Sequence, residues 1–313
     1  MIPSQTKLID EKVTSQLLKK RNRLGERFIE STLVFCGFIS IFITLGIVFE
    51  LGKEALPFFS STDFKLIKFL TGTTWQPQIK LFGVLPLVMA TLTTTVIALL
   101  IAIPFGIGIA IYLSEYASVK LRSTIKPTLE ILAGIPTVVY GYFALSFVTP
   151  FLRVLFGKDV VEIYNTASAG IVMGILILPL IASMSEDALA AVPRSLREAA
   201  YGLGATKIET TYRVVIPAAI SGLAAAIIVG ISRAIGETMI VALAAGAGPK
   251  FTFNPFQGAE TMTGHIVRVS GGDLSYDSID YNSLFGISLL LFFMTLSLNM
   301  LSQWVVRKLS EVK

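Results

Sequence analysis

Long apolar runs alternate with shorter polar segments along the chain. Six of the runs are long enough to cross a bilayer as a helix, at about 20 residues per crossing. We expect these spans at residues 28–49, 83–113, 128–151, 167–184, 218–247 and 283–306. Proline and glycine residues interrupt the second run and should bend or tilt it. The pattern predicts an all-α, polytopic membrane protein with about six transmembrane helices.

Composition supports this fold class. The 313 residues are 53% hydrophobic and only 15% charged, and the mean hydropathy is +0.73. A soluble domain carries nearer a quarter charged residues, on the order of 25%. The single cysteine, Cys36, excludes an internal disulfide. With no cluster of Cys and His, a structural metal is not expected, and the one histidine, His265, is expected to be a solvated residue of a polar, Gly-rich loop at residues 248–282.

The distribution of Lys and Arg predicts the orientation. Segments on the N-terminal side of the membrane hold 17 of the 26 basic residues, those on the other side hold 8, and Arg233 lies within a span. The positive-inside rule places both termini and the polar segment 193–217 in the cytoplasm. We expect a basic cytoplasmic leader at 1–27, a transmembrane domain at 28–308 and a tail at 309–313. The first run is interpreted as a retained span, because no small-residue cleavage pattern follows it.

Residues 193–217 form a polar segment between two spans. Pro193 suits a first helical residue, and Gly202 and Gly204 suit the end of that helix. Thr206 and Glu209 have the spacing of a capping box, which would start a second short helix. We therefore expect a helix, a glycine turn and a second helix, with a partly apolar face that suits a partner. A helix pair with only a structural role at the membrane surface is the alternative.

Two opposite charges, Arg233 and Glu237, lie near the middle of the fifth run. Charges at that depth cost about 2.5–3.5 kcal/mol each, and they default to a functional role. A spacing of four residues would put both on one helix face, where they could form an ion pair. The pair could be structural only. It could instead present a fixed guanidinium beside a water-filled path, with forked donors for a tetrahedral oxyanion, and Glu237 could accept a proton from a protonated anion.

Glu130 and Tyr140 are further candidates in the third run. Glu130 could line a path, but we favour an interaction with the dipole at a helix N-terminus. Tyr140 could line a cavity or only pack against neighbouring helices. The sequence Gly134-Ile135-Pro136 breaks the run between them. Unwound backbone at membrane depth usually faces a cavity, so this break is a candidate part of the path.

The sequence contains no recognisable nucleotide site. A P-loop requires G-x-x-x-x-G-K-[ST]. Gly157-Lys158 is followed by Asp159, and Leu152 stands where the first glycine is needed. The lone histidine also has no nucleophile near it in sequence. An enzymatic function is not expected, and ATP hydrolysis would have to occur on another chain.

The polar segment resembles the EAA loop of ABC importer permeases, in which E-A-A-x-x-x-G is followed after nine residues by I-x-L-P. The matching residues here include Glu198, Ala199, Ala200, Gly204 and Pro217, while Val214 and Ile216 are mild departures. In that family the loop docks on a cytoplasmic ATPase. The resemblance implies a type I importer permease fold, and it makes Arg197, Glu198, Ala199, Ala200, Gly204 and Pro217 the coupling residues.

Other stretches resemble the PstC-type permease subunits of phosphate-specific ABC importers. They include Thr71–Trp75, Phe82–Pro86, Tyr112–Tyr116, Pro127–Gly141 and Ser232–Met239. The resemblance implies inorganic phosphate as substrate, with Arg233, Glu237, Glu130 and Tyr140 as candidate residues of the path. It also implies a PstA-type second permease, a PstB-type ATPase pair that binds ATP and Mg²⁺, and an extracytoplasmic phosphate-binding protein, in the cytoplasmic membrane of a bacterium. No cofactor in this chain and no nucleic-acid partner are expected.

Three alternatives remain. The chain could be a permease for another oxyanion, such as molybdate or sulfate, or the sister PstA-type subunit. A channel or secondary transporter that works without ATP would need no cytoplasmic docking loop. Recovery of ATPase subunits with the solubilised chain separates that last class from the importers.

Overall fold

The structure is a computed structural model that describes residues 24–272 and 278–311. The chain divides into two units, residues 1–50 and 51–313. The described part of the first unit belongs to one apolar helix, α2 (Leu24–Phe59). Most of the predicted leader lies outside the described residues, as do the last two residues of the predicted tail. The proposed domain boundaries therefore stay predictions.

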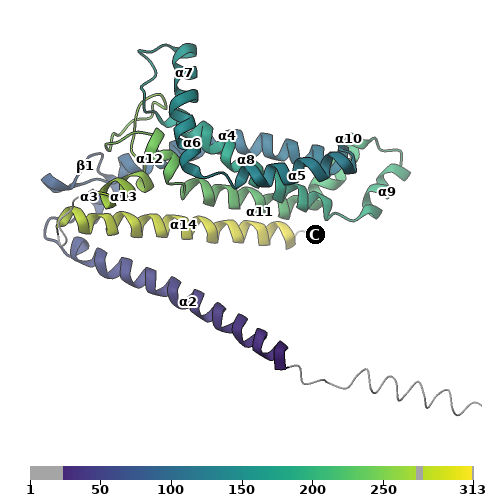
Figure 1. The fold of residues 1–313 in the computed structure, drawn as a ribbon, viewed down its shortest axis with the longest axis horizontal. Coiled ribbons are helices and arrows are strands. Elements are labelled where there is room, and N and C mark those ends of the chain that lie inside the picture. The colour runs from purple at the N-terminus through teal and green to yellow at the C-terminus, as the bar shows by residue number, and fades with distance from the viewer. Residues whose placement is uncertain (1–23, 273–277, 312–313) are drawn as a thin grey trace, which may run out of the picture. The chain divides into compact units, whose positions relative to one another are not determined.

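The described part of the second unit is mostly helical (Figure 1). Its helices and helical turns are α3 (Leu66–Thr71), η1 (Pro77–Ile79), α4 (Leu85–Ile111), η2 (Tyr112–Tyr116), α5 (Val119–Ala133), α6 (Thr137–Phe143), η3 (Ala144–Val148), α7 (Thr149–Phe156), α8 (Thr166–Ala190), α9 (Arg194–Gly202), α10 (Lys207–Thr210), η4 (Thr211–Val215), α11 (Ile216–Ile235), α12 (Met239–Ala244), α13 (Met262–Ser270) and α14 (Ile279–Glu311). A short antiparallel sheet joins β1 (Trp75–Gln76) to β2 (Leu81–Phe82).

The six predicted spans are confirmed in number within the described residues. Six helical stretches there are long and apolar enough to cross a membrane: Gly25–Phe59, Leu85–Tyr116, Thr137–Phe156, Thr166–Ala190, Lys207–Ile235 and Ile279–Lys308. The predicted bounds of the third and fifth spans were wrong. Each of those apolar runs contains a break, at residues 134–136 and 236–238. The third span begins after its break, at Thr137, and the fifth span ends before its break, at Ile235.

Two predicted loops also contain helices. The segment 114–126 includes the first half of α5, whose Ser118 side chain accepts a hydrogen bond from Leu121 N. The segment 248–282 includes α13, which begins where the Thr261 side chain accepts one from Gly264 N. In both cases a hydroxyl cap satisfies a free amide at the helix start, which lets a short polar sequence form a helix.

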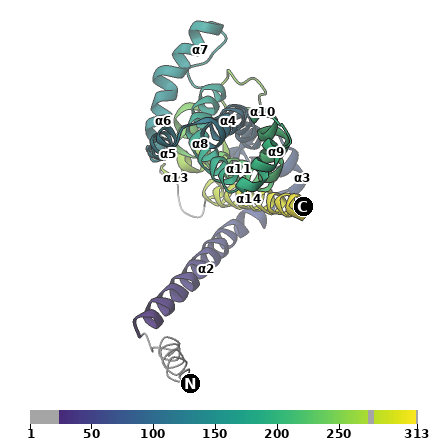
Figure 2. The ribbon, with the colours of Figure 1, turned by 90° about the vertical axis from the view of Figure 1, so that its right-hand side faces the viewer.

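Close packing of α4 on α8 forms the centre of the second unit (Figure 2). Gly170 and Gly174 lie one turn apart on α8, and both face α4. A Cβ atom at Gly174 would come within 2.8 Å of the Ala98 carbonyl oxygen, and one at Gly170 within 2.8 Å of Ile97. Small residues at this spacing let two membrane helices approach closely. The α4–α8 pair is thus the frame to which the other elements attach.

The second unit has two different ends (Figure 1). Helices α9 and α10 lie at one end, which we call the α9 end, and β1, α3 and α13 lie at the other, the α13 end. Aromatic side chains close the α13 end, where the Phe58 ring lies 5.0 Å from that of Phe82 and the Trp75 indole is buried. The two ends present different chemistry.

Candidate functional site

A break in the fifth apolar run separates Arg233 from Glu237. Helix α11 ends at Ile235 and α12 begins at Met239. The buried carboxylate of Glu237 accepts a hydrogen bond from Ile240 N at 3.5 Å, in the first turn of α12. The free amides of that turn favour a negative charge. The predicted placement of both residues on one helix face was therefore wrong, because the helix stops between them.

The Arg233 guanidinium is left available by this arrangement. Its side chain is exposed, and it has no hydrogen bond or ion pair among the described residues. The predicted ion pair with Glu237 is thus absent from the part of the chain that the structure describes. The Tyr140 hydroxyl lies near enough to the Arg233 guanidinium for the positive charge to act on it. A guanidinium without an internal acceptor can offer its forked donors to an oxyanion.

A second break, between α5 and α6, is held by Tyr140. Pro136 has no N–H with which to continue the helix, so the Leu132 carbonyl loses its usual donor. The Tyr140 hydroxyl donates to that carbonyl oxygen at 3.0 Å. The phenol is 9% exposed and belongs to the main core cluster. Of the two possibilities given for Tyr140, the structure shows packing against neighbouring helices. Its hydroxyl also fixes the break through the bond to Leu132.

The two breaks lie next to each other because α6 packs on α12. A Cβ atom at Gly141 of α6 would lie 2.7 Å from the Leu243 side chain and 3.2 Å from the Met239 carbonyl oxygen, both on α12. Thr263 of α13 adds a further contact, since its hydroxyl donates to the Glu237 carbonyl oxygen at 2.7 Å. We call this arrangement of two packed helix breaks with Arg233 the break site.

Glu130 has a different setting from the one that we favoured. It is exposed and lies in the last turn of α5, which ends at Ala133. The dipole of a helix favours acidic groups at the N-terminus and disfavours them at the C-terminus. The prediction of a dipole interaction was therefore wrong. Glu130 remains a candidate residue of the path.

The EAA-like loop, residues 193–217, forms the α9 end. Pro193 precedes the helix as its cap instead of being its first residue, and α9 ends at Gly202. Gly204 has a φ of +84°, a conformation that favours glycine. The predicted capping box is confirmed, because Thr206 and Glu209 each accept a hydrogen bond from the other residue's backbone amide. Pro217 lies in the first turn of α11.

One face of this loop presents apolar and polar groups to its surroundings. Leu203 is 90% exposed, and Ile208 and Tyr212 are also mostly exposed. Glu198 and Ala199 are exposed, whereas Ala200 is buried. Exposed apolar side chains that gather on one element suit a protein partner.

Arg197 fixes the loop to the rest of the unit. Its Nε and Nη2 atoms donate to the two carboxylate oxygens of Glu115 in η2 at 3.2 and 2.8 Å. Its Nη1 and Nη2 atoms also donate to the carbonyl oxygens of Val192 and Leu189, at the end of α8, at 2.5 and 2.9 Å. A forked pair of this kind is strong and directional. We call it the Arg197–Glu115 clamp; Glu115 was missed because it lies 82 residues earlier in the sequence.

A second ionic cluster joins α5 to α8 near the clamp. The fully buried carboxylate of Glu186 pairs with Arg122 and Lys126. Burial opposes the charge of Lys126, but hydrogen bonds and charges from Asp187 and Glu186 outweigh it and raise the pKa of Lys126. A buried carboxylate needs such partners because an unpaired one would be costly. The cluster therefore holds α5 against the frame.

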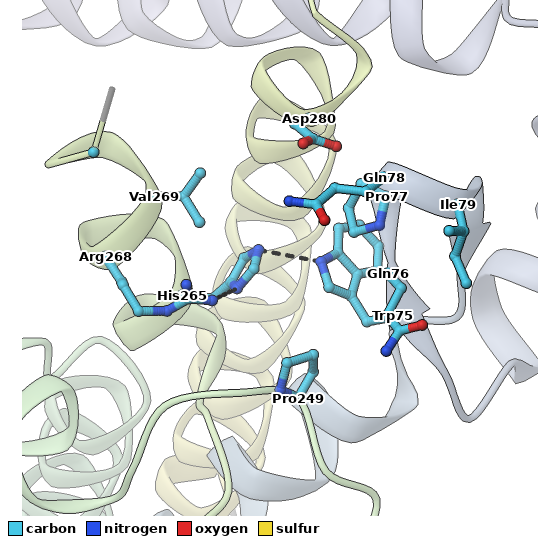
Figure 3. Close-up of a pocket in the computed structure, with 11 residues that line it drawn as sticks. Trp75, Gln76, Pro77, Gln78, Ile79, Pro249, His265, Arg268, Val269 and Asp280 are labelled. Atoms are coloured by element: carbon cyan, nitrogen blue, oxygen red, sulfur yellow. Dashed lines mark hydrogen bonds between the residues drawn. The ribbon is translucent and has the colours of Figure 1, made fainter. Parts of the chain in front are cut away.

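The α13 end contains a different network, around His265 (Figure 3). The Trp75 indole donates to His265 Nε2 at 3.1 Å, and His265 Nδ1 lies 3.2 Å from the buried Glu260 carboxylate. Because the indole can only donate, Nε2 is the acceptor and Nδ1 carries the proton toward Glu260. His265 is 5% exposed, so its prediction as a solvated loop residue was wrong. Its contact with Trp75 joins residues 190 positions apart, which no sequence pattern indicates.

Arg268 completes this network. Its Nε and Nη2 atoms donate to the two oxygens of Glu260 at 2.5 and 3.0 Å. Burial alone would raise the pKa of the Glu260 carboxyl, but the hydrogen bonds from His265 and Arg268 and the positive charge of Arg268 lower it. Glu260 in turn raises the pKa of Arg268. A cavity of about 550 Å³ lies against this network and the β1–η1 turn (Figure 3).

Comparison with known proteins gives the family. Residues 102–311 match the family described as the inner membrane component of binding-protein-dependent transport systems. The chain is 34% identical over 291 residues to the probable ABC transporter permease protein YqgH of Bacillus subtilis, covering 92% of this chain and 91% of the relative. It is 33% identical over 261 residues to the phosphate transport system permease protein PstC of Mesorhizobium japonicum, covering 77% and 78%. The chain belongs to this family of transport permeases.

Solved structures support the fold. An inward facing structure of the MetNI methionine ABC transporter covers 77% of this chain and 99% of its own, with a TM-score of 0.53 and 22% identity. A bacterial alginate ABC transporter, in complex with a pentasaccharide-bound periplasmic protein, covers 92% and 98%, with a TM-score of 0.56 and 17% identity. The predicted all-α fold of an ABC importer permease is therefore confirmed.

Proposed function

We propose that this chain is a permease subunit of an ATP-driven importer that carries inorganic phosphate across the cytoplasmic membrane. Family membership supports import as a membrane component of a transport system. Relatives named PstC, each about 30% identical over most of the chain, favour phosphate. The observation that carries the proposal is Arg233 at the break site, a guanidinium that has no acceptor among the residues that the structure describes.

The break site suits a tetrahedral oxyanion. Glu237 directs its carboxylate to the first turn of α12, so it does not neutralise the charge of Arg233. Helix breaks at membrane depth are tolerated where they line a cavity. One arginine can bind a phosphate oxygen pair with two charge-assisted hydrogen bonds and still release it. A separate binding protein would then supply most of the selectivity.

Import also requires a route for force from the ATPase. The partners in this proposal are a second permease of the PstA type, an ATPase pair of the PstB type and an extracytoplasmic phosphate-binding protein. The EAA-like loop would receive the motion of the ATPase on its exposed face. The Arg197–Glu115 clamp would pass that motion to η2, which continues α4, and to the end of α8. Because α4 and α8 form the frame, a shift of the loop would move the whole bundle.

Uptake of labelled phosphate tests the proposal. Vesicles that contain the assembled complex and the binding protein should accumulate phosphate only with ATP, and an excess of sulfate or molybdate should leave the rate unchanged. Suppression of uptake by sulfate or molybdate would favour the alternative of another oxyanion. Uptake that continues without ATP would favour a channel or secondary transporter.

A further inference from the structure

A second cavity lies beyond the C-terminal end of α12, whereas the break site lies at the N-terminal end of that helix. It has a volume of about 740 Å³ and is formed by the end of α7, the segment 158–164 and the turn 246–250. Its charged lining residues are Arg153, Lys158, Lys250 and Glu162. Three positive side chains against one negative side chain give the cavity a positive potential, which attracts anions. We call it the anion cavity.

Arg153 has an unmet hydrogen-bonding need there. Its Nε atom is buried and has no acceptor among the described residues. Its Nη2 atom donates only to the Lys158 carbonyl oxygen, at the long distance of 3.5 Å. A buried donor without an acceptor is destabilising. Such a donor beside a positively charged cavity indicates an acceptor that arrives from outside the chain.

Glu162 and Lys250 of the cavity wall are more fully satisfied. Glu162 accepts from Gly258 N at 2.7 Å and lies 3.5 Å from the Lys250 ammonium group. This pairing offsets one of the three positive charges and leaves Arg153 and Lys158 in excess. Of the two, Arg153 is the residue with forked donors suited to an oxyanion.

The wall of the cavity is preformed. Gly246 has a φ of +111°, and a Cβ atom there would lie 3.1 Å from the Gly258 Cα atom. Asn165 N donates to the Ala244 carbonyl oxygen, and Ala259 N donates to that of Ala245, both at 3.0 Å. These bonds tie the end of α12 to both neighbouring segments. A fixed wall can hold an anion without the entropy cost of ordering loops.

Helix α12 connects the anion cavity to the break site. It runs from Met239, next to Glu237, to Ala244, next to the turn that lines the cavity. Six helical residues rise by about 9 Å, at 1.5 Å per residue. An anion in the cavity would therefore lie one short helix away from Arg233. Helix α11 runs from the α9 end to the break site, and α12 follows beyond its far end (Figure 1).

We propose that the anion cavity is an entry site for inorganic phosphate, which Arg153 holds before the ion reaches Arg233. This inference rests on the proposed function, because it assumes that phosphate is the transported ion. The chemical class is a free tetrahedral oxyanion bound by one arginine and assisted by Lys158 and Lys250. The competing occupant of the same positive surface is an acidic face of the binding protein.

Initial rates of labelled-phosphate uptake test the entry site in vesicles with the intact complex. Arg153→Gln should lower the maximal rate at saturating binding protein by about tenfold, the effect of losing one charge-assisted contact to the ion. The double variant Lys158→Gln/Lys250→Gln should lower it a few-fold, with a loss that grows at low ionic strength. Arg153→Lys should keep most of the rate. Lys68→Gln removes an exposed charge from α3 at the same end and serves as the matched control.

The outcomes are distinct. Unchanged rates in both cavity variants would overturn the entry site, while normal wild-type uptake would leave the proposed function intact. Recovery of the Arg153→Gln rate at binding-protein concentrations above those that saturate the wild type would also overturn it, because the charges would then hold that protein and not the ion. An equal loss in Lys68→Gln would mean that total surface charge matters and would overturn it too. Wild-type vesicles that take up no phosphate would instead contradict the proposed function itself.

Discussion

Arg197 and Arg233 are the same residue type in opposite circumstances. Arg197 has four hydrogen bonds, its side chain is 15% exposed, and that of its partner Glu115 is 5% exposed. Arg233 is exposed and has no hydrogen bond or ion pair among the described residues. Each lies within a helix and has an acidic residue close to it in sequence. Only the three-dimensional arrangement of acceptors separates them.

The difference separates structural from functional charge. A guanidinium with four of its five N–H donors occupied, as in Arg197, fixes the elements that it joins and has little left for a ligand. A guanidinium without acceptors does not stabilise the fold, so its presence at membrane depth requires another explanation. We infer that Arg197 transmits motion and that Arg233 contacts the transported ion.

Loss of the free arginine should have the largest effect. Arg233→Gln should lower phosphate uptake at least about 100-fold, because two charge-assisted hydrogen bonds of about 1.5–3 kcal/mol each are lost. The complex should still assemble, since Arg233 holds no other described element. Uptake in vesicles and recovery of the ATPase with the permease measure the two properties. Normal uptake would show that Arg233 has only a structural role.

Loss of the clamp should uncouple the two ends. Glu115→Gln leaves Arg197 with its two carbonyl acceptors but without its counter-ion, and should reduce uptake by about five- to tenfold. ATP hydrolysis should fall less than uptake, so more ATP is hydrolysed per phosphate imported. Lys120→Gln, an exposed charge on the neighbouring α5, is the control. Equal losses of hydrolysis and uptake would argue against a role in transmission.

Loss of the Tyr140 hydroxyl, which holds the break between α5 and α6, should reduce phosphate uptake only modestly. Tyr140→Phe keeps the packing but removes the hydrogen bond to the Leu132 carbonyl oxygen, which contributes about 0.5–1.5 kcal/mol. We expect uptake to fall about threefold, with unchanged expression and assembly. A loss as large as that of Arg233→Gln would instead give the phenol a direct part in transport.

Arg268 is a second arginine held by a forked pair with a carboxylate, and it offers a pH test with a small effect. The lowered pKa of Glu260 means that its stabilising contribution is complete above the ordinary value of 4.5 and is lost as the pH falls through the folded value. Glu260→Gln should lower the unfolding temperature of the complex by a few degrees at pH 7, on the order of 2–4 °C. The gap to wild type should begin to narrow below pH 4.5 and should close as the pH falls through the lowered pKa of Glu260. A constant gap would exclude ionisation of Glu260 as its cause.

The sequence predicted local features better than long-range ones. The Thr206–Glu209 capping box follows from residues three apart, and the Gly204 turn follows from one residue's backbone freedom. The clamp joins residues 82 positions apart, and the Trp75–His265 bond joins residues 190 apart. Apolar periodicity gives no information about such pairs.

The break site was predicted only in part. Pro136 predicts the break between α5 and α6, because proline has no N–H with which to continue the helical hydrogen-bonding pattern. The break after Arg233 has no proline, and a spacing of four in an apolar run favoured a continuous helix. Gly236 weakens the end of α11. The Glu237 side chain then accepts a hydrogen bond from Ile240 N in the first turn of α12. In the structure the Glu237 carboxylate contacts the first turn of α12 and not Arg233.

The central claim is that a fixed positive charge at residue 233 binds phosphate on its path through the membrane. It can be tested in one measurement on Arg233→Cys in a Cys36→Ser background, where residue 233 is then the only cysteine. ATP-dependent phosphate uptake is measured before and after reaction with a thiol reagent that adds an aminoethyl group. We predict that uptake is lost in the variant and partly restored by the positively charged adduct, but not by a neutral adduct of similar size. Uptake that survives the substitution, or returns equally with the neutral adduct, would contradict the claim.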